Sequence, residues 1–343
     1  MESLEKFFAL DFVQNAIPCL IVALLAWALI RARREPLWAE AYRRLGRNPV
    51  AVAAIVVIGI YGLVAFLDSI GTTDKVSQDR TTVIDRLFEM PKEKTYSAPF
   101  ASMTTGEPKP SALKAPGRHI MGTDGVGADV FYRTLKGART AFIISGLTTL
   151  IITPVGLILG LIAGYYGKFW DDIIQYVYTV ISSIPGILMQ IALVLVLGKG
   201  IWQICIALGA ARWVGMCRLI RGETLKHRDR EYVRAAKALG VSDLRILLRH
   251  ILPNLLPVII ITVTLGFSGL ALSEAILSYL GIGVDASMGS WGNMIDSARD
   301  ELAREPVIWW NLTSASIALF VLVLAFQTLG DALRDAIDPR LRS

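Results

Sequence analysis

Residues 231–240 read EYVRAAKALG, a short charged stretch rich in alanine that stands between two long apolar runs. Glu231 would lie in the first turn of a helix, where a carboxylate suits the positive helix end, and Asp229 is a residue type that caps helix N-termini. Gly240 is the residue type that ends helices in the left-handed conformation. The stretch therefore predicts a short helix that ends at a tight turn.

A second helix is predicted directly after this turn. Ser242 can cap its start, and Pro253 is expected to mark its end. Leucines and isoleucines recur at helical spacing on one face, and arginines lie on the other: Leu244, Leu247, Leu248 and Ile251 against Arg245 and Arg249. Such a rigid pair can transmit motion by presenting the small residues Ala235, Ala236 and Ala238 to a partner's groove. The alternative is an amphipathic helix that lies on anionic lipid.

The composition of the whole chain indicates a membrane protein that crosses the bilayer several times. Of the 343 residues, 54% are hydrophobic and 19% are charged, and the mean hydropathy is +0.52. The net charge of +6 comes from basic residues that flank apolar runs, a distribution typical of membrane orientation and not of nucleic-acid binding. The three cysteines form no CxxC or Cys/His cluster, so neither a disulfide framework nor a metal site is expected.

Seven apolar runs predict an all-α, polytopic fold, since about 20 apolar helical residues cross the hydrocarbon core. The first, near residues 15–30, is followed and not preceded by its basic cluster, so we expect it to be retained and not to be a signal peptide. The six longer runs are Pro49–Ile70, Ala138–Tyr166, Ile173–Leu197, Ile201–Ile220, Leu255–Gly281 and Val307–Leu329. The fold class is therefore about six transmembrane helices plus one additional N-terminal helix.

These runs divide the chain into five regions. Residues 1–48 hold the additional helix and a cytoplasmic linker, residues 49–70 an entry transmembrane helix, and residues 71–136 an extracytoplasmic loop, whose five prolines favour an extended strap. Residues 137–331 form the membrane core, which contains a charged loop at 222–254, and residues 332–343 form a tail. Arginines and lysines gather around residues 31–47 and 226–249, so the positive-inside rule places the charged loop and the C-terminus in the cytoplasm.

Several residues inside the apolar runs stand out. Gly156, Gly160 and Gly164 recur every four residues, which allows a close approach by another helix of this chain or of a second subunit. Pro154 and Pro185 are expected to kink or unwind their runs. Glu274 either forms a helix–helix hydrogen bond, lies near the outer interface, or lines a translocation path. A last group is expected to anchor the fifth run at the inner interface: Arg212, Trp213, Arg218 and Arg221.

The charged loop resembles the cytoplasmic EAA loop of permease subunits of bacterial ATP-binding-cassette (ABC) importers. That pattern is E-A-A, three residues, Gly, then about a dozen residues to Leu-Pro, and Arg234 stands where the pattern has Glu. HIMGTDGVGADVFYRTLKGARTA (119–141), LSYLGIGVDASMGSWGNMIDSARD (277–300) and LGDALRDAIDPRLR (329–342) are similar to segments of the dipeptide and oligopeptide branch. The resemblance covers Tyr42 to Arg342 and implies an ATPase-coupling role for Asp229, Glu231, Arg234, Ala235, Ala236, Gly240, Leu252 and Pro253.

The resemblance implies a type I importer permease of the inner membrane that moves di- or oligopeptides by alternating access. Its implied partners are a second related permease, two ATPase subunits and an extracytoplasmic substrate-binding protein. Nickel complexes, opines and sugars remain alternative substrates. No G-x-x-x-x-G-K-[ST] motif occurs, so ATP is expected on the partner subunits, with no catalytic residue or cofactor in this chain. A channel, a secondary transporter or a membrane enzyme is less favoured, because no internal repeat, HExxH or GxSxG is present.

Overall fold

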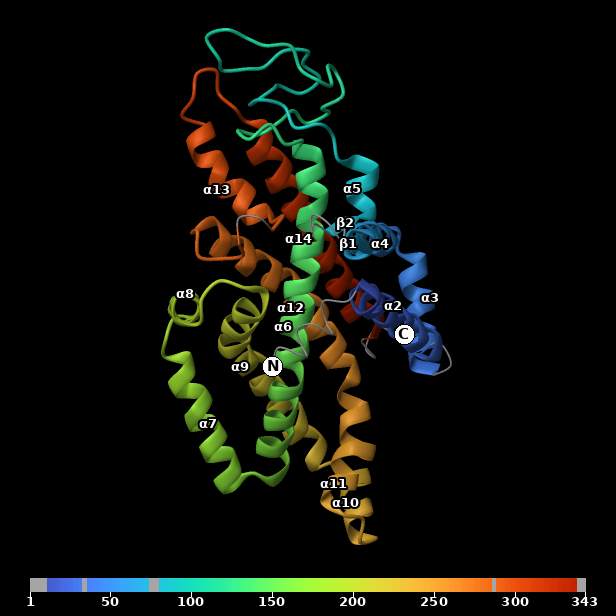
Figure 1. Ribbon diagram of the computed structural model, residues 1–343. Helices are drawn as coiled ribbons and strands as arrows, with labels where there is room; N and C mark the ends of the chain where they lie inside the picture. Colours follow the sequence, from blue (N-terminus) through green and yellow to red (C-terminus); the bar gives the residue numbers. More distant parts are fainter. Residues whose placement is uncertain (1–10, 33–35, 74–79, 286–287, 338–343) are drawn as a thin grey trace.

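The computed structural model describes residues 11–32, 36–73, 80–285 and 288–337, and most of these are helical. Figure 1 shows the long helix α6 crossing the molecule from end to end, with the other long helices around it. The helices are α2 (Asp11–Ala32), α3 (Pro36–Arg47), α4 (Pro49–Ser69), α5 (Val83–Phe88), α6 (Val130–Tyr166), α7 (Lys168–Ser182), α8 (Gly186–Leu197), α9 (Ile201–Arg228), α10 (Glu231–Ala238), α11 (Asp243–Ile246), the π-helical turn η1 (Leu247–Ile251), α12 (Leu252–Tyr279), α13 (Trp291–Glu301) and α14 (Trp310–Ile337).

The described residues hold five helices that are long and apolar enough to cross a membrane: α4, α6, α9, the continuous helix from Asp243 to Tyr279, and α14. Helices α7 and α8 make a sixth span if they are counted as one, with a bend of 82° between them. The bend lies at Pro185, where the sequence predicts a kink. The chain is thus an all-α polytopic membrane protein. The apolar part of α2, Asn15–Leu24, is shorter than these spans.

Three predicted boundaries differ from the structure. Helix α6 begins at Val130, before its apolar run, and continues without a break through Pro154. Helix α9 runs on to Arg228, and α14 runs to Ile337, so residues 332–337 continue a helix and do not form a separate tail. A helix ends where its backbone hydrogen bonds are capped, and this need not coincide with the end of the apolar stretch. Residues 338–343, with Arg340 and Arg342, lie outside the described residues.

The segment between α4 and α6 is not the extended strap predicted from its prolines: it starts with a short strand pair and a short helix and continues mainly as turns and bends. Strand β1 (Gly71–Thr73) pairs antiparallel with β2 (Arg80–Thr82), Gly71 opposite Thr82, and α5 follows. Residues 89–129 then form an irregular layer around a buried histidine: His119 Nδ1 lies 2.7 Å from Asp129 Oδ2, and its Nε2 lies 3.3 Å from Glu93 Oε1. In Figure 1 this layer caps one end of the molecule, and α10 with α11 forms the other end.

The core of the bundle is the close contact between α6 and α9. A Cβ atom built on Gly156 would lie 2.6 Å from Met216 Cβ, one on Gly160 2.8 Å from the Cys217 carbonyl oxygen, and one on Gly164 2.6 Å from Thr224 Cβ. The three glycines therefore face α9 of the same chain, as in the intrachain alternative. This packing fixes the position of α9 along the axis of α6. It therefore also positions the residues that follow Arg228, the last residue of α9.

Candidate functional site

Residues 229–253 form a protruding element at the end of the molecule opposite the irregular layer (Figure 1). Its first helix, α10, ends in a Schellman turn: the Gly240 N–H donates to the Lys237 carbonyl and the Val241 N–H to the Ala236 carbonyl. Gly240 has a φ of +75°, in the left-handed region that the sequence predicts. Residues 237–240 at this turn are exposed and form the tip of the element.

Asp229 does not cap α10, contrary to the prediction. It is the residue that follows α9, and α10 begins after Arg230 with no side-chain hydrogen bond at its N-terminus. The Asp229 carbonyl oxygen instead accepts hydrogen bonds from Arg234 Nε and Nη2, at 3.1 and 2.8 Å. Arg234, at the position where the EAA pattern has Glu, therefore ties α10 to the end of α9 by capping a carbonyl. Glu231 is exposed in the first turn of α10.

The second helix of the protruding element does not end at Pro253. It passes through α11 and the π-helical turn into α12, so that Leu252 and Pro253 are the first residues of the transmembrane part. Proline is tolerated there because a first-turn position needs no N–H donor, and the preceding π turn absorbs the irregular hydrogen bonding. The protruding element is therefore an extension of a membrane-spanning helix and not a separate helix on the membrane surface.

The apolar residues of the protruding element divide into a buried and an exposed face. Val233, Ala236, Ile246, Leu247 and Ile251 are buried in one cluster with residues of α6, α9 and α12. Ala236 is only 7% exposed, so the prediction that it is presented to a partner is wrong. Ala235 is exposed, as that prediction requires. Leu244 and Leu248 are likewise exposed and not part of the buried face, contrary to the prediction.

Side-chain hydrogen bonds attach the protruding element to α6. The Tyr165 hydroxyl donates to Asp243 Oδ1 at 2.6 Å, and Arg228 Nη1 donates to the Gly164 carbonyl at 3.2 Å, near the end of α6. His227 Nδ1 lies 2.7 Å from the Tyr232 hydroxyl. The element is thus held by α6, α9 and α12 together. A force applied to its tip is transmitted to all three helices.

Glu274 lies inside the bundle and is 2% exposed. Its Oε1 accepts hydrogen bonds from Ser278 Oγ and Ser290 Oγ, both at 2.8 Å. These bonds link α12 to the start of α13, as in the hydrogen-bonding alternative. In this conformation the side chain does not line an open passage.

Arg212 and Trp213 do not anchor α9 at its end, contrary to the prediction. Trp213 is buried against α6 and α7. Arg212 lies mid-helix, where its Nη2 donates to the Gly269 carbonyl at 2.9 Å and to Ser273 Oγ at 2.5 Å, both on α12. Arg218 and Arg221 lie closer to the end of α9, where the Arg218 guanidinium stands over the Tyr178 ring.

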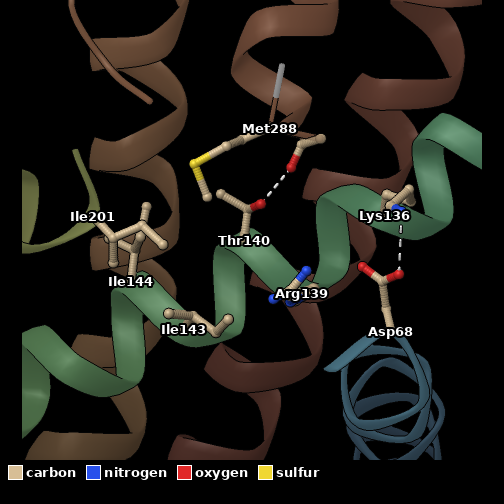
Figure 2. A pocket seen from close by; sticks show the side chains of 9 residues that line it. Asp68, Lys136, Arg139, Thr140, Ile143, Ile144, Ile201 and Met288 are labelled. Atoms are coloured by element: carbon tan, nitrogen blue, oxygen red, sulfur yellow. Dashed lines mark hydrogen bonds and ion pairs between the residues drawn. The ribbon is translucent and has the colours of Figure 1, made fainter. Parts of the chain in front are cut away.

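A cavity of about 170 Å³ lies between the end of α4, α6 and the loop before α13. Figure 2 shows Lys136 pointing toward Asp68 and Thr140 pointing toward the loop, where its hydroxyl donates to the Gly289 carbonyl. Asp68 Oδ2 and Arg139 Nε are buried with no hydrogen-bond partner. The charged side chains of the lining are thus one acidic and two basic residues.

The ion pair beside this cavity extends to α5. Lys136 Nζ lies 2.5 Å from Asp85 Oδ1, which also accepts from the Tyr132 hydroxyl. Burial alone would raise the pKa of Asp85, but the hydrogen bonds from Lys136, the Thr82 N–H and Tyr132 outweigh burial and lower the pKa to about 2. Asp85 is therefore an ionised link between α5 and α6 at neutral pH.

The comparison with known families now identifies the class of this membrane protein. Residues 156–343 match the family described as "Binding-protein-dependent transport system inner membrane component". The chain belongs to this family, and it is a transmembrane permease component of an ABC importer.

Relatives match almost the whole chain. The dipeptide transport system permease protein of Alkalihalophilus pseudofirmus is 32% identical over 306 residues, 89% of this chain and 91% of the relative. The dipeptide transport system permease protein of Bacillus subtilis is 34% identical, with 88% and 86% covered. The glutathione transport system permease protein of Pectobacterium atrosepticum is 32% identical, with 89% and 92% covered.

One solved structure is also similar, the MetNI methionine ABC transporter in an inward-facing conformation. It is 17% identical, with a TM-score of 0.48, and the match covers 60% of this chain and 97% of that chain.

Proposed function

We propose that this chain forms half of the passage of a peptide importer and that the protruding element couples the passage to separate ATPase subunits. The exposed tip of the element carries the proposal. Leu239 is 83% exposed and Leu244 is 63% exposed, beside the exposed Ala235. Apolar side chains gathered on a projecting, otherwise charged element are typical of a surface that another protein covers.

The attachment of this tip supports a coupling role. Because the protruding element continues α9 and α12 and is tied to α6 by Tyr165, a partner that moves the tip also moves three long helices. Two such permeases, two ATPases and an extracytoplasmic binding protein make up the proposed assembly, with the second permease a related but different chain. ATP-driven closure of the ATPases would then switch the passage between inward-open and outward-open states.

The proposed substrates are di- or oligopeptides, as the names of the relatives indicate for those proteins. The chain itself is proposed to carry no catalytic residue and no cofactor, since ATP would bind to the partner subunits. The arginines and lysines around residues 226–249 favour a cytoplasmic position of the protruding element in the inner membrane, and the irregular layer would then face the binding protein.

Reconstitution tests this proposal. The chain is placed in proteoliposomes with its partner permease, ATPase subunits and binding protein, and uptake of radiolabelled trialanine is measured. We expect uptake that requires both ATP and the binding protein. Uptake of a nickel complex, an opine or a sugar without any uptake of peptide would contradict the peptide assignment. Peptide uptake that persists without the ATPase subunits would contradict the importer mechanism.

A further inference from the structure

Arg212 lies at the middle of the membrane-spanning bundle. It follows Ile201, the first residue of α9, by eleven residues, which is about 16 Å along a helix. The neighbouring Gly209 faces Ile151 of α6, and the Trp213 carbonyl faces Gly156. Arg212 is therefore level with the centre of the apolar run 138–166, where a charge is most costly.

The guanidinium has only neutral partners among the described residues. Both of its hydrogen bonds come from Nη2 and end on a carbonyl and a hydroxyl of α12. Within the described part of the chain no carboxylate forms an ion pair with Arg212, and the nearby Glu274 is bonded to two serines. An intramembrane cation without a counter-ion is expensive, so a group outside this part of the chain is expected to compensate it.

The unused donors of Arg212 are accessible. Nε and Nη1 have no partner among the described residues, and neither is among the buried unpaired atoms. Nη1 lies against α12, since a Cβ added to Gly269 would lie 2.9 Å from it. Arg212 as a whole is half-buried, so its guanidinium reaches the surface of this chain at mid-membrane depth.

Three environments can adjoin such a surface: lipid tails, a second permease, or the passage between two permeases. Lipid tails are excluded by the cost of the charge and by the depth, which is too great for the side chain to reach the headgroups. A passage filled with water satisfies the free N–H groups and admits an anion.

We propose that Arg212 is a binding residue in the passage, which pairs with the C-terminal carboxylate of the transported peptide; this rests on the proposed function. Guanidinium and carboxylate form charge-assisted hydrogen bonds that are stronger than those between neutral groups. Nη2 stays fixed on α12 through Gly269 and Ser273, while Nε and Nη1 are free to donate to the carboxylate. Arg212 would thereby select solutes that carry a negative charge at one end.

The test compares trialanine with trialanine amide, which lacks the carboxylate. Binding protein is loaded to equal, measured occupancy with either peptide, so that selection before the passage does not enter, and uptake is measured in the proteoliposomes described above. The wild type is expected to import the acid about tenfold faster than the amide, as the loss of one charge-assisted hydrogen bond implies. Arg212→Gln is expected to lower uptake of the acid to that of the amide and to leave the amide unchanged.

Two further variants separate charge from structure. Arg212→Lys keeps the charge and is expected to restore most of the preference for the acid. Arg218→Gln removes an arginine of the same helix that stands over Tyr178, and it is expected to leave the preference unchanged. Basal ATP hydrolysis of Arg218→Gln is expected to equal that of the wild type.

Several outcomes would overturn the proposal. Equal import of both peptides by the wild type refutes it without any variant and leaves the proposed function intact. Failure of Arg212→Gln to assemble with the partner permease would assign the counter-ion to that subunit instead. Import of neither peptide by the wild type refutes the proposed function, and the inference with it.

Discussion

Replacing Gly160 with alanine tests whether the α6–α9 contact is as tight as the structure indicates. The added Cβ would lie 2.8 Å from both the Cys217 carbonyl oxygen and Ile220 Cβ, so the helices must separate by about 0.6 Å to restore ordinary contact near 3.4 Å. Overpacking of this kind costs about 1–3 kcal/mol. Removing a glycine from a helix returns up to about 1 kcal/mol. The net loss of unfolding free energy is therefore about 0–2 kcal/mol, against a gain for a glycine replaced without overpacking.

Gly146 of the same helix provides the matched control, because a Cβ there would meet no heavy atom within 4 Å. Gly146→Ala is expected to be neutral or slightly stabilising, from helix propensity alone. Unfolding of the purified variants is followed by circular dichroism during titration with sodium dodecyl sulfate in mixed micelles. If Gly160→Ala is as stable as Gly146→Ala, the close packing of α6 on α9 is refuted.

Three further changes probe the two ends of the molecule. Ala235→Trp on the exposed face should leave the chain folded but abolish peptide-stimulated ATP hydrolysis. Ala236→Trp in the buried cluster should instead lower the unfolding free energy by about 1–3 kcal/mol. Equal peptide-stimulated ATP hydrolysis in the wild type and in Ala235→Trp would contradict the proposed docking surface. The pKa of Asp85 is about 2 in the folded chain and near 3.9 in the unfolded chain. The ionised carboxylate should therefore add about 2 kcal/mol to the unfolding free energy above pH 4, and this stabilisation should be lost as the pH falls toward 2. Limited proteolysis between pH 2 and pH 7 measures this loss as faster cleavage within residues 83–129 at low pH. In an Asp85→Asn variant the cleavage rate should not increase in this way as the pH falls. His119→Leu removes the hydrogen bonds to the buried Glu93 and Asp129 carboxylates. It should lower the unfolding free energy by about 1–3 kcal/mol and make the irregular layer sensitive to protease at neutral pH. Unchanged digestion would show that the histidine does not stabilise the layer.

The membrane fold could be predicted from the lengths of the hydrophobic runs. The turn at Gly240 could be predicted from the residue type alone. The apolar runs place α4, α6, α9, α12 and α14 correctly because about 20 apolar residues are required to cross a bilayer.

The errors come from features that a linear pattern does not contain. Pro253 does not end its helix, because a π turn just before it supplies an alternative hydrogen-bonding arrangement. Leu244 and Leu248 are not on the buried face, which Ile246, Leu247 and Ile251 form instead. Ala235 and Ala236 are indistinguishable as residue types, and only tertiary packing decides which of them is exposed.

Arg212 illustrates a signal that the sequence does carry. It lies six residues before Arg218 and inside the apolar run, so it is too far from the helix end to share the interfacial position of the later arginines. Counting the rise per residue would have separated it from them. The partners on α12 could not be found in this way, since they depend on which face of α9 meets which helix.

Site-directed crosslinking from the tip of the protruding element tests the central claim most directly. Leu239→Cys is introduced at the exposed tip in a Cys19→Ser background, since Cys19 is exposed whereas Cys205 and Cys217 are buried. Val126→Cys, 69% exposed in the irregular layer at the opposite end, is the control. The assembled importer in membranes should give an adduct between Leu239→Cys and an ATPase subunit, altered by ATP, and none from Val126→Cys. Capture of an ATPase from position 126, or no capture from position 239 in an importer that hydrolyses ATP, would contradict the account.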